Sequence, residues 1–313
     1  MSHEVGGADQ VQLPTIGSAT PHSTAVGRLG VSRRRGGLVA LIALSSLTCL
    51  YGLGSGPPMG DHECINAVAA RQSFESGSWL IPELDNAPWI RKTPLGIWLI
   101  EASSSLIGQP DGALPVTDLS ARLPSALAGM ANVFVVFWLG SMLYGHRGGL
   151  VAGFICAGSV ATVMFSRNPQ VDMVLTLFTT LSFGCFWRGA MHPQPSKLHM
   201  ASFFLMFALA MLAKAPLPLA MIGLSLAAYW FIALPLLAAT EQGERSLEAI
   251  ARRSIRDWRE SISGLRKLWL MPGVLVFLVV VGAWPVYVYT HVDNALALWR
   301  GRVSCPLYGR AVR

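Results

Sequence analysis

The fold is decided by residues 123–166, LPSALAGMANVFVVFWLGSMLYGHRGGLVAGFICAGSVATVMFS, in which Arg147 is the only Lys, Arg, Asp or Glu. A helix of about 20 apolar residues crosses the hydrocarbon core of a membrane, which is roughly 30 Å thick. The uncharged runs Leu123–Gly145 and Gly148–Ser166 therefore predict two successive membrane-spanning helices joined by a short turn.

The composition of the whole chain agrees with this prediction. Hydrophobic residues make up 52% of the 313 residues and charged residues 13%, about half the charged share of a soluble globular protein. The net charge of +7 would suit a nucleic-acid partner, but most of the 24 Lys and Arg residues lie in short segments between apolar runs. We therefore predict no nucleic-acid binding. The five cysteines are scattered without a C-x-x-C pair, which argues against a disulfide framework and a zinc site.

Five more uncharged runs are long enough to cross a membrane, so the sequence predicts an all-α polytopic membrane protein with about seven transmembrane helices. These runs are Gly36–Gly60, Met173–Trp187, Leu198–Ala213, Ala215–Thr240 and Leu268–Thr290. The membrane domain is expected over residues 36–292. The polar tail before it, residues 1–35, is expected to be disordered and cytoplasmic.

An eighth apolar run, Pro94–Gly108, is interrupted by Glu101 and is expected to lie on the membrane surface. With seven spans and a cytoplasmic N-terminus, most Lys and Arg residues fall on the cytoplasmic side, as the positive-inside rule requires. All seven basic residues of the loop 241–267 are then cytoplasmic. That loop could form an amphipathic helix on an anionic leaflet or a solvated connector. The segment 293–313 is then outside.

The outer loop between the first two spans, residues 57–122, is rich in polar groups. It delivers Asp61, His62 and Glu63 directly after the first span. A short amphipathic helix is expected over Cys64–Ser76, ended by Gly77. Its apolar side is expected to carry Ile65, Val68, Ala69 and Phe74. Tryptophans at 79, 89 and 98 suit a segment at headgroup depth, so short interfacial helices are expected in this loop.

Six stretches in this order resemble the family 39 glycosyltransferases, which include protein O-mannosyltransferases and lipid A aminoarabinose transferases. They are Asp61–Glu63, Gly77–Pro82, Lys92–Leu95, Arg122–Pro124, Ser166–Asp172 and Ala213–Pro216. The resemblance implies a type C glycosyltransferase fold in the cell inner membrane. It also implies a sugar donor carried on a polyprenyl phosphate, a lipid or protein acceptor on the outer, periplasmic face, and inversion at the anomeric carbon. Family members are typically longer, which implies that this sequence is the N-terminal part.

The resemblance also suggests roles for individual residues. An acidic residue near the first span would be the general base, Lys92 and Arg91 would bind the donor phosphate, and Asp172 would be a second outward-facing carboxylate. The base stays open between Asp61 and Glu63, because His62 occupies the position of the usual aspartate, and a lost base is a third alternative. Further departures are Arg91 in place of an acidic residue and Thr93 in place of a proline. His62, Arg122 and Lys214 are candidate supporting residues.

Simpler roles compete with these. Lys92 and Arg91 could anchor to phospholipid phosphates, Asp172 could cap a helix beside Arg167, and Lys214 and Arg122 could be membrane-interface anchors. His62 between two acids could hold a divalent cation, but the three positions are adjacent and no second histidine is paired with them. A divalent cation therefore stays an open alternative, and no metal ligands are assigned. The alternative to an enzyme is a non-catalytic protein, either a carrier-lipid transporter or a scaffold.

Overall fold

The computed structural model describes residues 21–55, 60–85, 87–107, 115–191, 196–233 and 270–299, without the side chains of residues 21–34, 61–63, 191, 230, 270 and 271. The chain divides into the units Met1–Ala40 and Leu41–Arg313, and the site described below lies in the second. The longer helices are α1 (Pro21–Leu50), α2 (Asp61–Ser76), α3 (Leu95–Ile107), α4 (Asp118–Gly158), α6 (Asp172–Phe186), α7 (Lys197–Lys214), α8 (Leu217–Ala228) and α11 (Leu270–His291). The short elements are η1 (Leu53–Ser55), β1 (Glu83–Leu84), β2 (Ala87–Pro88), α5 (Val160–Ser166), η2 (Trp187–Met191), η3 (Tyr229–Ala233) and α12 (Ala295–Trp299).

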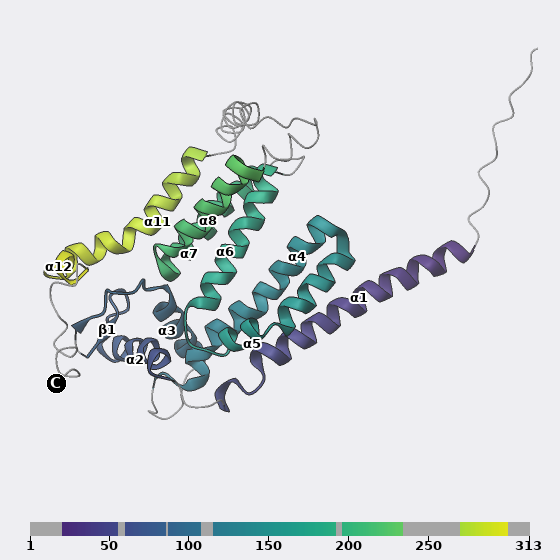
Figure 1. Ribbon diagram of the computed structural model, residues 1–313. Helices are drawn as coiled ribbons and strands as arrows, with labels where there is room; N and C mark the ends of the chain where they lie inside the picture. Colours follow the sequence, from purple (N-terminus) through teal and green to yellow (C-terminus); the bar gives the residue numbers. More distant parts are fainter. Residues whose placement is uncertain are drawn as a thin grey trace, which may run out of the picture. The chain divides into compact units, whose positions relative to one another are not determined.

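Helix α4 contains two antiparallel segments, because the backbone reverses at Gly145. Gly145 has a φ of 74°, a left-handed conformation that glycine adopts without a steric penalty. A Cβ on Gly153 would lie only 3.3 Å from the Cβ of Phe137, which a straight helix would hold far away. Figure 1 shows the two halves of α4 side by side. The two helices predicted from residues 123–166 are therefore present, with the turn where the sequence placed it.

Among the described residues, four helical segments are long and apolar enough to cross a membrane: Arg35–Ser55, Asp118–Gly158, Lys197–Lys214 and Pro272–His291. The second contains the two halves of α4. The remaining predicted spans correspond to α6 continued by η2 and to α8 continued by η3, which are shorter. Within the described residues, each predicted span overlaps a helix, although Gly148–Ser166 is divided between α4 and α5 at Ser159. The prediction of a polytopic all-α fold is confirmed.

Some predicted boundaries differ from the structure. Helix α1 begins at Pro21 and so extends into the segment expected to be disordered, while residues 1–20 lie outside the described residues. The basic loop 241–267 and residues 300–313 also lie outside them, so the predictions for these segments stay predictions. Residues 295–299 form the short helix α12.

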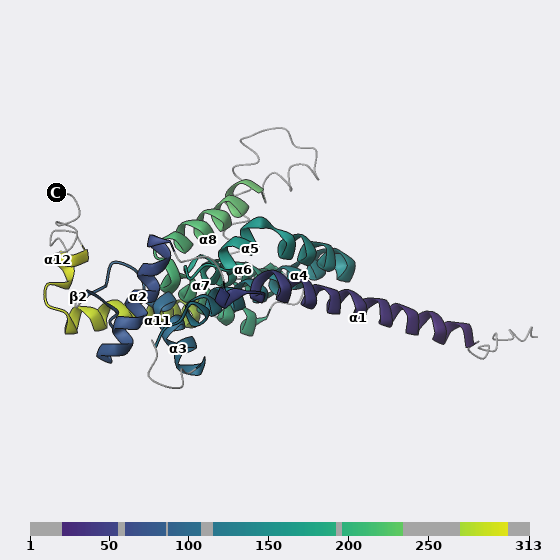
Figure 2. The same cartoon turned by 90° about the horizontal axis from the view of Figure 1, so that it is seen from below.

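The outer loop folds into α2, the two-residue hairpin β1–β2 and α3, which gather at one end of the long helices (Figures 1 and 2). Gly77 follows α2 with a φ of 75°, so it ends the helix as predicted. The predicted apolar side of α2 is wrong in part. Val68 is exposed, and the buried side consists of Asn66, Ala69, Ala70 and Ser73. Small residues are buried there because α3 packs closely against that side.

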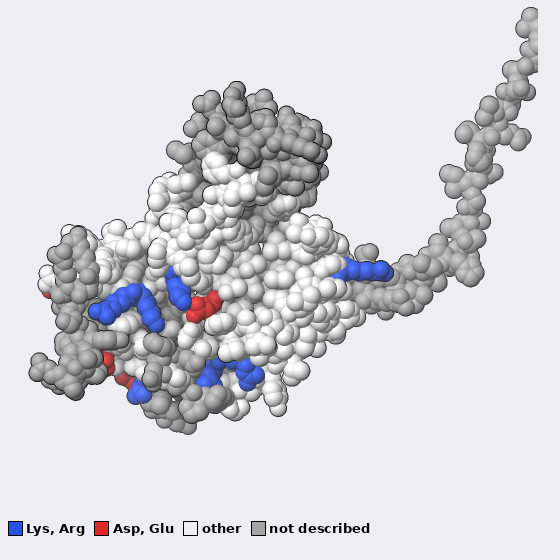
Figure 3. Space-filling view, in the orientation of Figure 1, with Lys and Arg blue, Asp and Glu red and all other residues white. Residues whose placement is uncertain are grey.

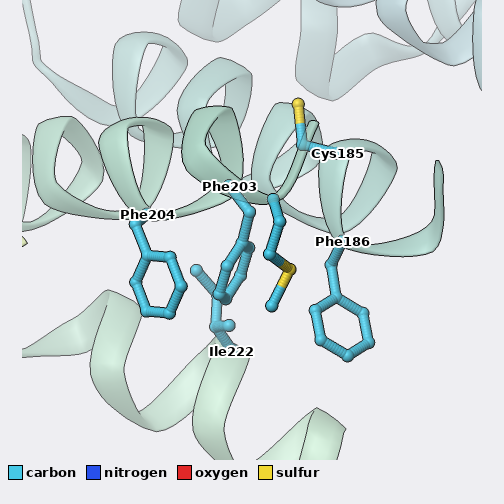
Figure 4. Close-up of a cluster of buried hydrophobic side chains, with 6 residues drawn as sticks. Cys185, Phe186, Phe203, Phe204 and Ile222 are labelled. Carbon is cyan, nitrogen blue, oxygen red and sulfur yellow. The ribbon is translucent and has the colours of Figure 1, made fainter. Parts of the chain in front are cut away.

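The core of the other end is aromatic. Figure 4 shows Phe186 at the end of α6 on the same side as Phe203 and Phe204 of α7 and near Ile222 of α8, while Cys185 points the other way. All five belong to one buried cluster. The ring centroid of Phe203 lies 5.3 Å from that of Phe186 and 5.0 Å from that of Phe204, and both pairs are in edge-to-face arrangements. This cluster holds α6, α7 and α8 together at the end away from α2 and α3.

Candidate functional site

A polar pocket of about 380 Å³ lies where α2, the start of α3, the start of α6 and the end of α7 meet. Its lining consists of Asn66, Arg91, Lys92, Thr93, Gly96, Ile97, Gln170, Val171, Asp172, Ala213, Lys214 and Ala215. The structure thus brings together four predicted site residues, Arg91, Lys92, Asp172 and Lys214, from three separate parts of the chain. We call this hollow the cationic pocket.

The segment that carries Arg91 and Lys92 is anchored on both sides. Before it, Ile90 is buried, and its carbonyl oxygen accepts a hydrogen bond from Nε1 of Trp299 at 3.0 Å. After it, the Oγ1 of Thr93 donates to the carbonyl oxygen of Ala213 at 2.8 Å. Arg91 and Lys92 both reach solvent, although the ammonium group of Lys92 is partly buried where it meets Asn66. Their side chains are therefore presented to the pocket from a fixed backbone.

Asp172 and Lys214 form an ion pair across the pocket. The Nζ of Lys214 lies 2.7 Å from the Oδ1 of Asp172, and the two side chains are 47% and 28% exposed. The helix cap predicted as the simpler role of Asp172 is not what the structure shows: the N-cap of α6 is Val171, and Asp172 is the first helical residue. A carboxylate in the first turn of a helix is stabilised by the helix dipole. Lys214 is the last residue of α7, and its ammonium group pairs with the carboxylate of Asp172 in the pocket.

Asn66 is a pocket residue that the sequence did not indicate. It is buried on α2, its Nδ2 donates to the carbonyl oxygen of Pro169 at 3.2 Å, and its Oδ1 lies 3.5 Å from the Nζ of Lys92. The only signal in the sequence was that Asn66 falls on the same side of the helix as Ala69, Ala70 and Ser73. On a helix surrounded by water, an amide on that side would not be buried. Without coordinates, that signal could not be told from an ordinary amphipathic pattern.

The surroundings of Lys92 disfavour its charged form. Partial burial against the pocket wall lowers the pKa of Lys92, and the positive charge of Lys214 lowers it further, while Asp172 opposes both effects. An anion in the pocket would favour the charged form of Lys92. Binding of a negative group would therefore relieve the unfavourable surroundings of the charged Lys92.

Glu101 lies behind the pocket, one helical turn after Ile97 on α3. It is 1% exposed and does not line the pocket. Burial raises the pKa of Glu101 to about 8, and the hydroxyl of Ser73 on α2 opposes this shift. The carboxyl is therefore largely protonated at neutral pH.

The other predicted residues lie outside the pocket lining or outside the description. Arg122 is buried, and its Nη1 donates to the carbonyl oxygen of Leu53 at 3.2 Å, so it joins α4 to the end of the first span. Asp61, His62 and Glu63 form the first turn of α2, the helix that brings Asn66 to the pocket, but their side chains lie outside the described ones.

The described charges make the pocket suited to an anion. Three cations, Arg91, Lys92 and Lys214, face one described carboxylate, Asp172. Figure 3 shows Lys and Arg side chains around a small acidic patch on one face of the molecule. A phosphate could accept hydrogen bonds from the lysines and the guanidinium together.

Comparisons with known proteins agree with this geometry. A family model described as dolichyl-phosphate-mannose-protein mannosyltransferase matches residues 91–240, which include all four charged pocket residues. An undecaprenyl phosphate-alpha-4-amino-4-deoxy-L-arabinose arabinosyl transferase of Pectobacterium atrosepticum is 28% identical over 144 residues, 46% of this chain and 24% of the relative. A second such transferase, from Proteus mirabilis, is 24% identical over 153 residues, 48% of this chain and 26% of the relative. The matched part of the chain spans about a quarter of the length of these relatives.

The fold is shared with crystal structures of ArnT from Cupriavidus metallidurans. The apo structure superposes with a TM-score of 0.67 at 20% identity and covers 85% of this chain and 44% of that chain. The structure bound to undecaprenyl phosphate gives a TM-score of 0.68 at the same identity and covers 85% and 43%. The predicted glycosyltransferase-like membrane fold is confirmed by this likeness, and the four apolar helices agree with a membrane location.

Proposed function

We propose that this chain forms the membrane part of a glycosyltransferase. The proposal starts from the resemblance to the family 39 glycosyltransferases, which the family match and these relatives support. The enzyme moves a sugar from a polyprenyl-phosphate carrier to a lipid or protein acceptor at the periplasmic face, with inversion. The observation that carries this proposal is the cationic pocket, in which Arg91, Lys92 and Lys214 surround one hollow next to Asp172.

The pocket supports a division of labour between phosphate and acceptor. The cations stabilise the carrier phosphate as the bond between the anomeric carbon and the phosphate oxygen breaks. A general base removes the proton from the acceptor hydroxyl, whose oxygen forms the new bond to the anomeric carbon from the opposite side. The phosphate leaves on its lipid with both electrons of the broken bond. Asp172, at the pocket wall, orients the acceptor or the base.

The register of α2 favours one of the two candidates for the base. Residues three and four apart in a helix lie on the same side. Position 63 precedes Asn66 by three residues and position 62 by four, whereas position 61 precedes it by five. We therefore assign the base to Glu63 ahead of Asp61, with His62 as a neighbour on the same side of the helix.

The arrangement of basic segments supports a periplasmic pocket and a cytoplasmic N-terminus. Arg147 lies beside the turn within α4, and the segment between η3 and α11 contains seven Lys and Arg residues. The described elements on either side of that segment, η3 and the start of α11, and the turn of α4 lie away from α2 and α3 (Figure 1). Because cytoplasmic segments retain positive charges, the pocket end is assigned to the outer face. Labelling of single cysteines at positions 91 and 147 with an impermeant maleimide in intact cells tests this assignment, and it is wrong if position 147 reacts first.

The alternative function is a carrier-lipid transporter or scaffold without catalysis. Transporters place charged groups near the membrane midplane between repeated elements. The described charges of the pocket lie instead at helix ends, which favours transfer at a membrane surface.

Two measurements on the purified full-length protein in lipid nanodiscs test the proposal. Undecaprenyl phosphate should bind in preference to phosphatidic acid, which carries the same headgroup charge on a different lipid. Incubation with a panel of polyprenyl-phosphate sugars should then release sugar to an acceptor. Equal affinity for phosphatidic acid would favour simple anchoring to phospholipids. Selective binding without sugar release from any donor would favour the carrier-lipid alternative.

A further inference from the structure

Asn66 connects three parts of the cationic pocket. Its Nδ2 donates to the carbonyl oxygen of Pro169, which lies in the loop that leads into Asp172. That loop is fixed to α4 by a hydrogen bond of 2.8 Å from the Oγ of Ser125 to the carbonyl oxygen of Gln170. On its other side, the Oδ1 of Asn66 accepts from the Nζ of Lys92. A single side chain on α2 therefore spans the distance between Lys92 and the segment that carries Asp172.

The orientation of this amide follows from its partners. A carbonyl oxygen can only accept a hydrogen bond, so the nitrogen of Asn66 must face Pro169. The amide oxygen is then left facing Lys92, whose ammonium group can only donate. Both ends of the amide are matched, and because Asn66 is buried, few other positions are open to it.

The amide also has the right charge for a neighbour of a phosphate-binding lysine. A carboxylate at this position would form an ion pair with Lys92 and reduce the attraction for an anion. An apolar side chain would leave the ammonium group without an acceptor when the pocket is empty. An amide orients Lys92 and leaves its charge available to a ligand.

We propose that Asn66 is a positioning residue that holds the ammonium group of Lys92 in the cationic pocket, at a fixed distance from Asp172, in readiness for the carrier phosphate. The inference rests on the proposed function for the identity of the ligand, but the contact itself is tested without a ligand. Among the side chains that the structure describes, the other charged groups that face Lys92 are Lys214, Asp172 and Arg91, which also lines the pocket. Substitutions at Asn66 leave these three unchanged.

Two substitutions should move the titration of Lys92 in opposite directions. In Asn66→Leu, the ammonium group loses an acceptor, so its charged form is less favourable and the pKa of Lys92 should fall below that of the wild type. In Asn66→Asp, a negative charge replaces the neutral oxygen and the pKa should rise. Unfolding exposes Lys92 to water and raises its pKa, so a fall in Asn66→Leu cannot come from loss of structure.

The measurement is the rate of acetylation of Lys92 by trace acetic anhydride as a function of pH, followed by mass spectrometry on the purified full-length protein. Only the uncharged amine reacts, so the midpoint reports the pKa. Glu75→Gln is the matched variant on α2, because Glu75 pairs with Arg71 on the exposed side of the helix. Identical Lys92 midpoints in all variants, or an upward shift in Asn66→Leu, would overturn the inference.

Binding of undecaprenyl phosphate separates this inference from the proposed function. Asn66→Leu should bind at least roughly tenfold more weakly, because Lys92 is no longer held in position and its charged form is less favourable. Asn66→Asp should also bind more weakly, although its Lys92 midpoint rises. If the wild type does not bind undecaprenyl phosphate, the proposed function fails, and the acetylation midpoints still decide the role of Asn66. If the wild type binds and both variants bind equally well, the positioning role fails alone.

Discussion

The two ends of helix α6 lie beside hollows of similar size and opposite chemistry. At its first residue, Asp172, the cationic pocket has a volume of about 380 Å³. At its last residue, Phe186, a second hollow of about 300 Å³ lies between α4, α6 and α8. The second hollow is lined by Leu139, Met142, Leu143, Phe183, Phe186, Trp187, Ser225, Leu226 and Tyr229, without a Lys, Arg, Asp or Glu.

The difference teaches that packing of the long helices is enough to form a hollow. A hollow that binds a charged ligand also needs segments outside the helix bundle that place polar and charged side chains in it. At the cationic end, α2 and the loop before α3 supply Asn66 and Lys92 from outside the helix bundle. At the apolar end, the described lining comes from the long helices and η elements alone. We therefore expect substitutions at the first end to change function with little loss of stability, and substitutions at the second end to do the reverse.

The largest expected effect is at Lys92. Lys92→Ala should lower sugar transfer by about 100-fold or more, because a cation that stabilises the leaving phosphate is removed. The amount of protein in the membrane should change little, since Lys92 is exposed. Lys92→Arg, which keeps the charge, should retain part of the activity. Unchanged transfer by Lys92→Ala would remove the clearest functional difference between the two ends.

A pH effect on stability is expected from Glu101. Its folded-state pKa of about 8 exceeds the ordinary glutamate value of 4.5, so the fold retains a proton that the unfolded chain loses. The resulting stability is present below about pH 4.5 and is lost as the pH rises through about 8, by a few kcal/mol in total. Glu101→Gln should weaken this dependence in thermal unfolding at pH 5, 7 and 9. An identical pH dependence in wild type and variant would show that Glu101 titrates normally.

Phe203→Ala tests the apolar end. Removing the ring that contacts Phe186 and Phe204 should destabilise the protein by roughly 1–3 kcal/mol. The effect should be smaller than in a water-soluble core, because lipid is as apolar as the core and mainly packing is lost. Affinity for undecaprenyl phosphate in the folded fraction should not change. A loss of affinity at unchanged melting temperature would mean that the two ends are coupled through α6.

The smallest expected effect is on the ion pair of the cationic pocket. Asp172→Asn should change stability by less than about 1 kcal/mol, because the pair is partly exposed. Lys214 is released from its partner, so undecaprenyl phosphate should bind more tightly by up to about tenfold, while transfer falls. Titration calorimetry and a transfer assay measure the two quantities. Weaker binding would show that Asp172 holds Lys214 in place for the phosphate instead of competing with it.

The sequence predicted the helices better than it predicted their surfaces. Uncharged runs located α6, α7 and α11 to within a few residues, as in Leu198–Ala213 against the observed Lys197–Lys214, but missed the start of α1 at Pro21. The side of α2 was predicted less well, because Val68 is exposed and Asn66 is buried. Periodicity identifies apolar residues, but α3 packs closely and selects small side chains in their place. Asn66 could not be recognised as a pocket residue for the same reason.

What the sequence by itself determined is a membrane protein in which the segments that carry Lys92, Asp172 and Lys214 all fall on the same side of the membrane. That result needs only hydrophobic length and the alternating direction of spans. Only the tertiary structure decided that Lys214 pairs with Asp172, that Thr93 ties the Lys92 segment to Ala213, and that Asn66 reaches Lys92. These contacts join residues far apart in the chain. They depend on how closely helices approach and turn about their axes, which hydropathy does not encode.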